Sequence, residues 1–444
     1  MSSLLDPNAD IHKETLKKVL ASQNESFVPV LIELVRNNRV DSALVPNTAA
    51  LEKLSGKSFG STPKERMEWE PWVEWYGTTD IAPPPGFVGW KGYMLSKKDP
   101  KIIDLLTDQY PPAIRAEELQ LAGTKVDAIP TLDNPQHVAA SDADYMDDQE
   151  PVFGLVVNGE AMAYPLRIMT WHEAYNDVVG GEKIVVTYCP LSAAPIAYLS
   201  KADDGREYEF GTTGFEFRCN KMFFDRLTNS MWHQFTGKAV TGMLAAKQPR
   251  LPMIPVVVTT WKRWKELHPD TNVLSLNTGA VRDYWLGAVY ADSYEKSKLM
   301  FPVWLRSDAL PSMSFVYGMN LGEKQKAYSI EKLASERVVN DTLGGKPLVL
   351  IAAGDELVVD GKDKREDPVR FSVGAEIRVF ERGDNNFKPT EDPDVVLEEQ
   401  GKRWQVTENA LVGPENQKLP RLVGKLGFWS TWYTFFPKTA LYSK

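Results

Sequence analysis

Cysteine and histidine are scarce in this chain of 444 residues, which holds 2 cysteines and 5 histidines. Cys189 and Cys219 cannot form the framework of several disulfides that stabilises small secreted domains. They can form a single bridge, stay as two free thiols or share a metal ion. Any thiol chemistry of the chain therefore involves one or both of these residues.

Positive charge and long apolar runs are lacking as well. The formal net charge is −9, whereas phosphate binding needs clustered Lys and Arg, so neither nucleic acid nor an anionic membrane is an expected partner. No run approaches the roughly 18 apolar residues of a spanning helix. The first residues lack the basic and then apolar layout of an export signal, which predicts a soluble, cytoplasmic protein.

Familiar catalytic signatures are missing too. The sequence contains no Walker loop, Rossmann glycine fingerprint, nucleophile elbow or usual zinc motif. Its hydrophobic content of 43% and charged content of 25% are those of an ordinary soluble protein. The length predicts two to four domains, each able to bury a core.

The first part of the chain, residues 1–125, is predicted to be mostly helical. Apolar residues recur there at helical spacing, as at Val28, Leu31 and Ile32. The aromatic cluster that begins at Trp72 is more typical of a core between helices than of a ligand box. Residues 126–150 are punctuated by proline and aspartate and are predicted to form a connector.

The rest of the chain repeats itself. A first repeat over residues 151–275 and a second over residues 313–444, joined by a linker at 276–312, share residue pairs in the same order. The matching positions are Ala163-Tyr164 with Ala327-Tyr328, Asn176-Asp177 with Asn340-Asp341, Gly180-Gly181 with Gly344-Gly345, and Trp261-x-x-Trp264 with Trp429-x-x-Trp432. Two diverged copies of one unit of about 125 residues explain this pattern.

Each repeat is predicted to hold a β-hairpin, one helix and several strands. In the first repeat these are strands over 152–157 and 161–164 around Asn158-Gly159, a helix over 166–178, a buried strand that ends at Cys189, and strands over 196–199, 208–211, 215–219 and 230–235. The predicted fold class is therefore α+β. A helical amino-terminal region precedes two tandem, diverged β-rich repeats, whose mixed or antiparallel sheets can curl into a barrel.

The two repeats can be compared position by position. His172 aligns with Glu336, Cys189 with Ala353, and His233 with Gln405. Scaffold positions thus recur in both repeats, whereas the reactive side chains occur in the first alone. Either the first repeat kept a site that the second lost, or core positions drifted without functional consequence.

A thiol close to an imidazole is the arrangement of an activated nucleophile or of a soft-metal ligand pair. In this hypothesis Cys189 is nucleophile or ligand, His172 is its base or co-ligand, and Glu173 orients the histidine. Cys219, predicted on a strand face, and His233 would complete a metal site for an ion such as copper or zinc. The alternative is that each is a core residue, with His172 satisfied by a backbone carbonyl and Cys189 packing as a small apolar side chain.

A second polar group follows at Asp225 and Arg226. With the hydroxyls of Thr228 and Ser230, these two charges can form one polar wall of a pocket around the thiol. The alternative is a buried ion pair that fixes a turn, with the hydroxyls satisfying backbone groups.

These motifs resemble the family catalogued as domain of unknown function 3179 (DUF3179). The matching text lies within residues 115–275 and includes Asp127-x-Ile129-Pro130, Ala163-Tyr164-Pro165-Leu166, Thr187-Tyr188-Cys189-Pro190-Leu191 and Asp225-Arg226-x-Thr228-x-Ser230-x-Trp232-x-Gln234. The family's usual motif looks like Cys-Pro-Leu-Cys, which implies a redox or metal-binding thiol pair. Ser192 stands at the second cysteine position here, so the resemblance implies a monothiol, or a site in which Cys219 substitutes.

Two functions fit the sequence. One is a thiol and histidine site in the first repeat that binds a metal ion, or that acts on a small molecule by redox or nucleophilic chemistry. The other is a non-catalytic scaffold that binds a ligand, or a protein partner through the helical amino-terminal region, which the 13 tryptophans favour. The sequence leans toward the first function and names neither a substrate nor a metal.

Overall fold

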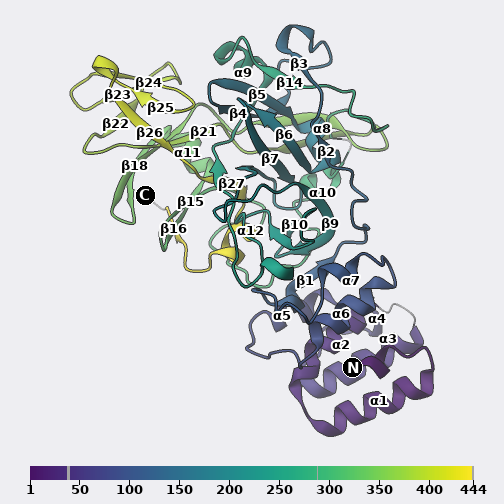
Figure 1. Cartoon of the computed structure of the whole chain (residues 1–444). Helices are drawn as coiled ribbons and strands as arrows, with labels where there is room; N and C mark the ends of the chain where they lie inside the picture. Colours follow the sequence, from purple (N-terminus) through teal and green to yellow (C-terminus); the bar gives the residue numbers. More distant parts are fainter. Residues whose placement is uncertain (38–40, 288, 443–444) are drawn as a thin grey trace.

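The computed structural model describes residues 1–37, 41–287 and 289–442. Helices form the first part of the chain and gather at one end of the molecule (Figure 1). They are α1 (Ala9–Ser22), α2 (Val28–Asn37), α3 (Asp41–Ser55), α4 (Pro63–Arg66), α5 (Glu70–Tyr76), α6 (Phe87–Ser96) and α7 (Ile102–Leu105). With the β-rich remainder they confirm the predicted α+β class. None of the helices described is both long enough and apolar enough to span a bilayer.

These helices enclose an apolar core of their own. Asn8 caps α1, because its side chain accepts hydrogen bonds from two N–H groups of the first turn. The stretch Val28–Val35 of α2 is buried on every side, and Trp72 is buried beside it, as the core interpretation of the aromatic cluster predicted. Phe215 and Phe224 of the first repeat belong to the same core, so the helices rest on that repeat.

The first repeat is built from antiparallel and mixed sheets. Its strands and helices, with the short strands that precede them, are β1 (Leu119–Leu121), β2 (Leu132–Asp133), β3 (His137–Ala139), β4 (Pro151–Val157), β5 (Glu160–Pro165), α8 (Leu166–His172), β6 (Ala174–Val179), β7 (Glu182–Cys189), β8 (Ala194–Leu199), β9 (Phe210–Phe217), β10 (Asn220–Asp225), β11 (Met231–His233), β12 (Met253–Ile254), β13 (Val257–Thr260), α9 (Trp261–Leu267) and β14 (Asn272–Leu274). The strand orders are β13-β4-β5-β14-β3, β12-β8-β7-β6-β2 and β1-β9-β10-β11. Asn158 and Gly159, at φ 48° and 88°, form the predicted turn between β4 and β5.

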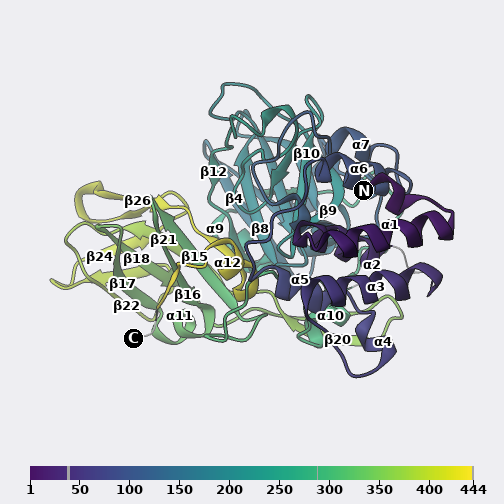
Figure 2. The same cartoon turned by 90° about the horizontal axis from the view of Figure 1, so that it is seen from below.

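The second repeat follows the helix α10 (Ala291–Glu295) and contains a curled sheet. Its elements are β15 (Phe315–Leu321), β16 (Lys324–Ser329), α11 (Ile330–Glu336), β17 (Val338–Leu343), β18 (Lys346–Ala352), β19 (Val358–Lys362), β20 (Pro368–Ser372), β21 (Ile377–Glu381), β22 (Phe387–Pro389), β23 (Val395–Glu398), β24 (Arg403–Val406), β25 (Ala410–Val412), β26 (Lys418–Leu422), β27 (Lys425–Phe428), α12 (Trp429–Phe435) and β28 (Ala440–Leu441). One sheet has the order β17-β18-β21-β26-β25-β24-β23-β22. The Asn340 amide closes it like a barrel, because it donates to the carbonyl of Phe387 and accepts from its N–H, each at 2.8 Å. Seen from below, this sheet and the amino-terminal helices lie at opposite ends of the molecule (Figure 2).

Three predictions about the first repeat are wrong. It holds a second helix, α9, besides the one that was predicted. The helix predicted over 166–178 ends at His172, because Glu173 takes a left-handed conformation with φ 61° and residues 174–179 pair with β7 as strand β6. The strands predicted over 208–211 and 215–219 are one strand, β9, which ends at Phe217. Cys219 therefore lies in the tight turn between β9 and β10, at φ 55°, and not on a strand face.

The residues shared by the two repeats make the same contacts in each. The hydroxyl of Tyr164 donates to Asp177 at 2.7 Å and that of Tyr328 donates to Asp341 at 2.7 Å, while the indole of Trp264 donates to Thr271 at 2.9 Å and that of Trp432 donates to Thr439 at 2.9 Å. Strand pairing agrees as well, since β13 pairs with β4 as β27 pairs with β15. The register is the same, with Val257 opposite Gly154 and Lys425 opposite Gly318.

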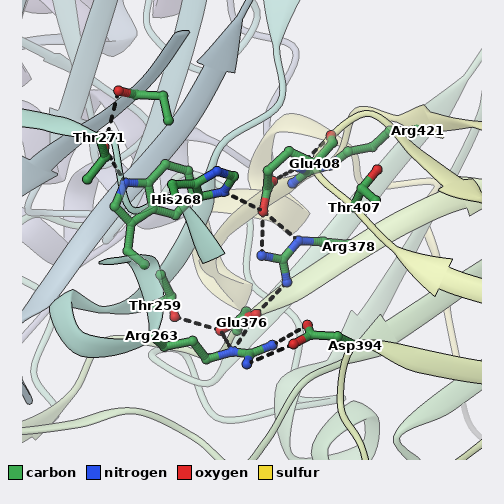
Figure 3. Close-up of polar contacts among 12 residues, drawn as sticks. Thr259, Arg263, His268, Thr271, Glu376, Arg378, Asp394, Thr407, Glu408 and Arg421 are labelled. Carbon is green, nitrogen blue, oxygen red and sulfur yellow. Dashed lines mark hydrogen bonds and ion pairs between the residues drawn. The ribbon is translucent and has the colours of Figure 1, made fainter. Parts of the chain in front are cut away.

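A network of charged side chains joins the two repeats (Figure 3). Arg263 of α9 binds Glu376 at 2.8 Å and Asp394 at 2.6 Å. Arg378 pairs with Glu376 and Glu408, and Glu408 also pairs with Arg421 and lies 3.8 Å from His268. Each of these charges has an opposite charge beside it, so the network is a docking contact between repeats.

Candidate functional site

His172 lies at the end of α8 and both of its ring nitrogens have partners. Nδ1 is 2.7 Å from the carbonyl oxygen of Pro130, and Nε2 is 2.6 Å from the hydroxyl of Tyr284. A carbonyl only accepts, so Nδ1 carries the proton and Nε2 accepts from the tyrosine. Burial lowers the pKa of His172, which keeps the ring neutral. The ring thus holds the connector against the segment that contains Tyr284, and it does not contact Cys189.

The two cysteines lie together in a small apolar cluster. Cys189 and Cys219 are both buried and free, and they pack with Leu191 and Val303. The N–H of Lys221 donates to Cys189 Sγ at 3.3 Å. Burial, and then the charge of Glu216, raises the pKa of Cys189 to about 12, and the same causes raise the pKa of Cys219. Both thiols are therefore protonated at neutral pH, which makes them weak nucleophiles.

Beside the cysteines lies a buried ionic cluster that sequence reasoning missed. Lys221 Nζ is 3.4 Å from Glu173 Oε2 and 3.1 Å from Glu216 Oε1, and Tyr290 donates to Glu173 at 2.9 Å. Glu173 thus serves this cluster and does not orient His172. Burial raises the pKa of Glu216 to about 7, the nearby ammonium of Lys221 opposing the shift. The alternation of Glu216 and Lys221 with apolar neighbours on β9 and β10 was the available signal, because it places both charges on one face of a sheet.

Asp225 and Arg226 point in different directions. Asp225 is buried and accepts hydrogen bonds from the indole of Trp232 at 2.8 Å and from the N–H and hydroxyl of Thr228 at 2.6 and 2.8 Å. Arg226 is half-exposed and binds Asp127 at 3.1 Å. The aspartate fixes the turn after β10, and the pair does not form one wall around the thiol.

The proposed metal ligands do not converge. Across residues 1–37, 41–287 and 289–442, no three His, Cys, Asp or Glu side chains are placed to hold a metal ion. Cys189 and Cys219 lie in their own cluster, His172 is bonded elsewhere, and His233 stacks on Phe217 with ring centroids 4.7 Å apart.

His233 lines a cleft that opens where the amino-terminal segment meets both repeats. This basic cleft has a volume of about 840 Å³, and none of its described lining residues is acidic. Its cationic lining residues are Arg115, Arg218, Lys238, Arg250 and Lys425. Three phenylalanines also contribute, of which Phe435 and Phe436 come from the end of α12. The cleft therefore combines positive charge with flat apolar surface.

Only two of the five cations are neutralised. Arg218 binds Glu118 through Nε at 2.7 Å and Nη2 at 3.1 Å, and Arg115 binds Glu117 at 2.8 Å. Among the residues described, no ion pair or side-chain hydrogen bond is found for Lys238, Arg250 or Lys425. Burial, and then the charges of Arg218 and Lys238, lowers the pKa of His233 to about 3.

Three buried polar atoms of the described lining have no hydrogen bond, and one of them is Nη2 of Arg115. His233 is 8% exposed, and its Nδ1 is 3.2 Å from the Thr236 hydroxyl, but its Nε2 has no hydrogen bond. The same holds for the side-chain oxygen of Asn320 on the opposite repeat. Buried polar atoms are usually satisfied, and these three remain available to hydrogen-bond a molecule that enters the cleft.

Sequence reasoning placed only His233 in this cleft. The signal for Lys425 was present in the repeat alignment, because the register of the tryptophan pairs puts Lys425 where the first repeat has Val257. Lysine is rarely buried without a partner, so a lysine at a core position that the other repeat fills with valine requires an explanation. The arginines gave no such signal, because they come from separate segments near residues 115, 218 and 250.

The comparisons with known proteins identify a family and no activity. The family described as Protein of unknown function (DUF3179) matches residues 126–439. We found no match among curated proteins and none among solved structures. The matched stretch covers both repeats, and is thus wider than the residues 115–275 on which the resemblance rested.

Proposed function

Because the chain belongs to the family described as Protein of unknown function (DUF3179), whose description names no activity, we propose a function from the geometry: the chain binds a small anionic molecule in the basic cleft. The observation that carries this proposal is the convergence of three unpaired cations, Lys238, Arg250 and Lys425, on a cleft whose described lining has no carboxylate. A volume of about 840 Å³ is in the range of small-molecule sites.

Electrostatics favour an anion at this place and disfavour one elsewhere. The chain as a whole carries a net charge of −9 and repels anions, whereas a recessed cleft lined by one sign of charge concentrates the opposite ion. Lys and Arg form charge-assisted hydrogen bonds to phosphate or carboxylate oxygens, which are the stronger kind. The neutral ring of His233 adds a hydrogen-bonding nitrogen without a charge.

The aromatic part of the lining indicates the rest of the ligand. Phe435 and Phe436 line the cleft beside the cations. Flat apolar side chains next to a charged anchor favour a ligand that carries a ring or short hydrocarbon on its acidic group. A phosphorylated or carboxylated small molecule with an apolar body matches this lining better than a bare inorganic ion.

The test is calorimetric titration of the full chain with inorganic phosphate and with phenyl phosphate. We expect both to bind, and phenyl phosphate to bind more tightly. The double variant K238Q/R250Q removes two unpaired cleft cations and should weaken phenyl phosphate binding at least tenfold, about 1.4 kcal/mol. Bound ligand should also raise the melting temperature of the wild type.

The matched control is K388Q/R403Q, which removes one lysine and one arginine from exposed positions of β22 and β24. It changes the net charge by the same amount but leaves the cleft intact. Equal weakening by both double variants would mean that only the overall charge matters. That result, or no binding by the wild type, would overturn the proposal.

A further inference from the structure

Lys425 occupies a core position of the repeat. It lies on β27 opposite Gly318 of β15. The corresponding residue of the first repeat is Val257, which lies opposite Gly154. Val257 is 1% exposed and Lys425 is 5% exposed. The first repeat therefore shows that this position folds with a plain apolar side chain, and the fold does not require an amine.

Among the described residues, no nearby negative charge offsets the cost of burying the Lys425 ammonium. Lys425 Nζ lies 5.7 Å from the ring centroid of Phe235 and 5.9 Å from that of Phe436, and no carboxylate pairs with it among the residues described. Burying an unpaired charge costs several kcal/mol, which two cation–π contacts recover only in part. Burial, and then the charge of Arg250, lowers the pKa of Lys425 to about 7. A large fraction of the amine is thus neutral near pH 7.

We propose that Lys425 is a nucleophilic amine that forms an imine with the carbonyl carbon of an anionic aldehyde or ketone held in the basic cleft. This inference rests on the proposed function, since Lys238 and Arg250 would hold the acidic group of that molecule. The proposed ligand is then not any small anion but a small molecule with both a carbonyl group and a phosphate or carboxylate.

The chemistry is that of a lysine activated by a dry site and a neighbouring cation. The lone pair of the neutral amine attacks the carbonyl carbon, and the carbonyl oxygen takes up a proton to give a carbinolamine. Loss of water, formed from that hydroxyl and a proton of the nitrogen, leaves a C=N bond to Nζ. No oxidation or reduction occurs, and the addition of water reverses the step. The faces of Phe235 and Phe436 favour the iminium cation as they favour an ammonium.

The test uses pyridoxal 5′-phosphate, which combines an aldehyde, a phosphate and an aromatic ring, on the full chain at pH 7.5. After brief exposure, borohydride reduces each imine to a stable amine, and peptide mass spectrometry locates the labelled lysines. We expect Lys425 to be labelled at least tenfold faster than any other lysine, and inorganic phosphate to slow that labelling. Pyridoxal, which lacks the phosphate, should label Lys425 more slowly and without competition by phosphate.

Variants at position 425 distinguish the role of the amine from that of the positive charge. K425R keeps a cation that forms no imine, and K425M replaces the amine by an apolar chain of similar length. Both should lose the fast label, whereas the exposed-site control K388R should keep it. Because labelling of the wild type is read directly, the inference stays testable even if one variant folds poorly.

Two outcomes would separate imine formation by Lys425 from the anion binding on which it rests. Labelling of Lys425 no faster than that of surface lysines, with phenyl phosphate still bound, would overturn the imine and leave anion binding standing. Fast labelling of Lys425 that phosphate does not slow would support the nucleophilic amine and overturn its anionic partner.

Discussion

At the scale of single residues, the buried charges of this chain fall into two groups. Most are compensated: Lys91 binds Glu33 and two backbone carbonyls, and Lys221 lies between two glutamates. In such pairs the partners replace part of the lost water. Lys425 belongs to the other group, since no anion balances it and the first repeat has valine at its place. Folding does not explain Lys425, whereas the proposed binding function would.

The first prediction concerns the stability cost of this lysine. Its pKa is about 7 in the folded chain and about 10.4 in an unfolded one. Between these values the unfolded chain binds a proton that the folded chain does not, so the free energy of unfolding should rise with pH. Urea denaturation from pH 7 to 9.5 should show wild type gaining up to about 1.4 kcal/mol per pH unit relative to K425M. K425M should also be the more stable variant at pH 7, by a few kcal/mol.

Parallel stability curves for wild type and K425M would contradict this account, since they would mean that the ammonium is solvated or paired. K388M is the control, because it removes a lysine from an exposed strand. Its curve should follow that of wild type at every pH.

The second prediction concerns the thiols. Cys189 and Cys219 are buried, and both have raised pKa values, that of Cys189 to about 12. We expect no rapid reaction with Ellman's reagent at pH 8 in the native chain, and reaction of both thiols after unfolding in urea. A fast-reacting native thiol would instead favour the nucleophile that the sequence suggested. The variants C189S and C219S would identify which thiol it is.

At the scale of elements, local signals in the sequence were sufficient for the scaffold. The Asn158-Gly159 pair predicted its turn, and the apolar run before Cys189 predicted the buried strand β7, because turn chemistry and alternation are local properties. The helix after the hairpin was predicted too long. Residues 174–179 have helical spacing, but pairing with β7 overrides it, and Glu173 at φ 61° ends the helix.

The candidate site was harder to predict, for a geometric reason. His172 and Cys189 belong to neighbouring elements, yet chain spacing does not give the direction of a side chain, and each group found other partners. The basic cleft joins segments near residues 115, 218, 250 and 425, which no local pattern relates. What the sequence did contain was the repeat register, which marks Lys425 as the departure from valine.

The third prediction compares one hydrogen bond in the two repeats. Tyr164 and Tyr328 each donate to the aspartate of the next strand at 2.7 Å. Each aspartate has a second partner, since Asp177 lies 2.9 Å from His137 Nε2 and Asp341 is paired with Lys326, but the Asp177 side chain is 3% exposed and that of Asp341 is 16% exposed. Removal of a hydrogen bond to a buried charged group costs about 1.5–3 kcal/mol. Y164F should therefore destabilise the chain by about 2 kcal/mol in urea denaturation, and Y328F by less than half of that.

Equal losses for Y164F and Y328F would mean that burial of the aspartate does not set the strength of this contact. The pair needs no further control, since each variant removes one hydroxyl from the same position of the repeat.

At the scale of the whole molecule, the relative position of the repeats decides whether the basic cleft exists. His233 and Arg250 come from the first repeat, and Asn320 and Lys425 from the second. The ionic network of Figure 3 joins the two repeats through Arg263 and Glu376, away from the lining of the cleft. If the repeats bind a molecule between them, this network has the role of keeping both halves of the cleft in place.

The last prediction tests that role through Glu408, which pairs with Arg378 and Arg421. Burial raises the pKa of Glu408, but the two guanidinium charges outweigh burial and hold the pKa well below its ordinary value. E408Q leaves these buried arginines without their shared anion, and should cost about 3–5 kcal/mol at pH 7. The contribution of Glu408 is fully present above about pH 4.3 and is lost as the pH falls further, so the deficit of E408Q should shrink below that value. E391Q, at an exposed position of the same repeat, is the control and should match wild type.

Because the network also holds the repeats together, E408Q should bind phenyl phosphate more weakly than E391Q, although Glu408 does not line the cleft. Undiminished binding by a destabilised E408Q would show that the cleft keeps its shape without the network.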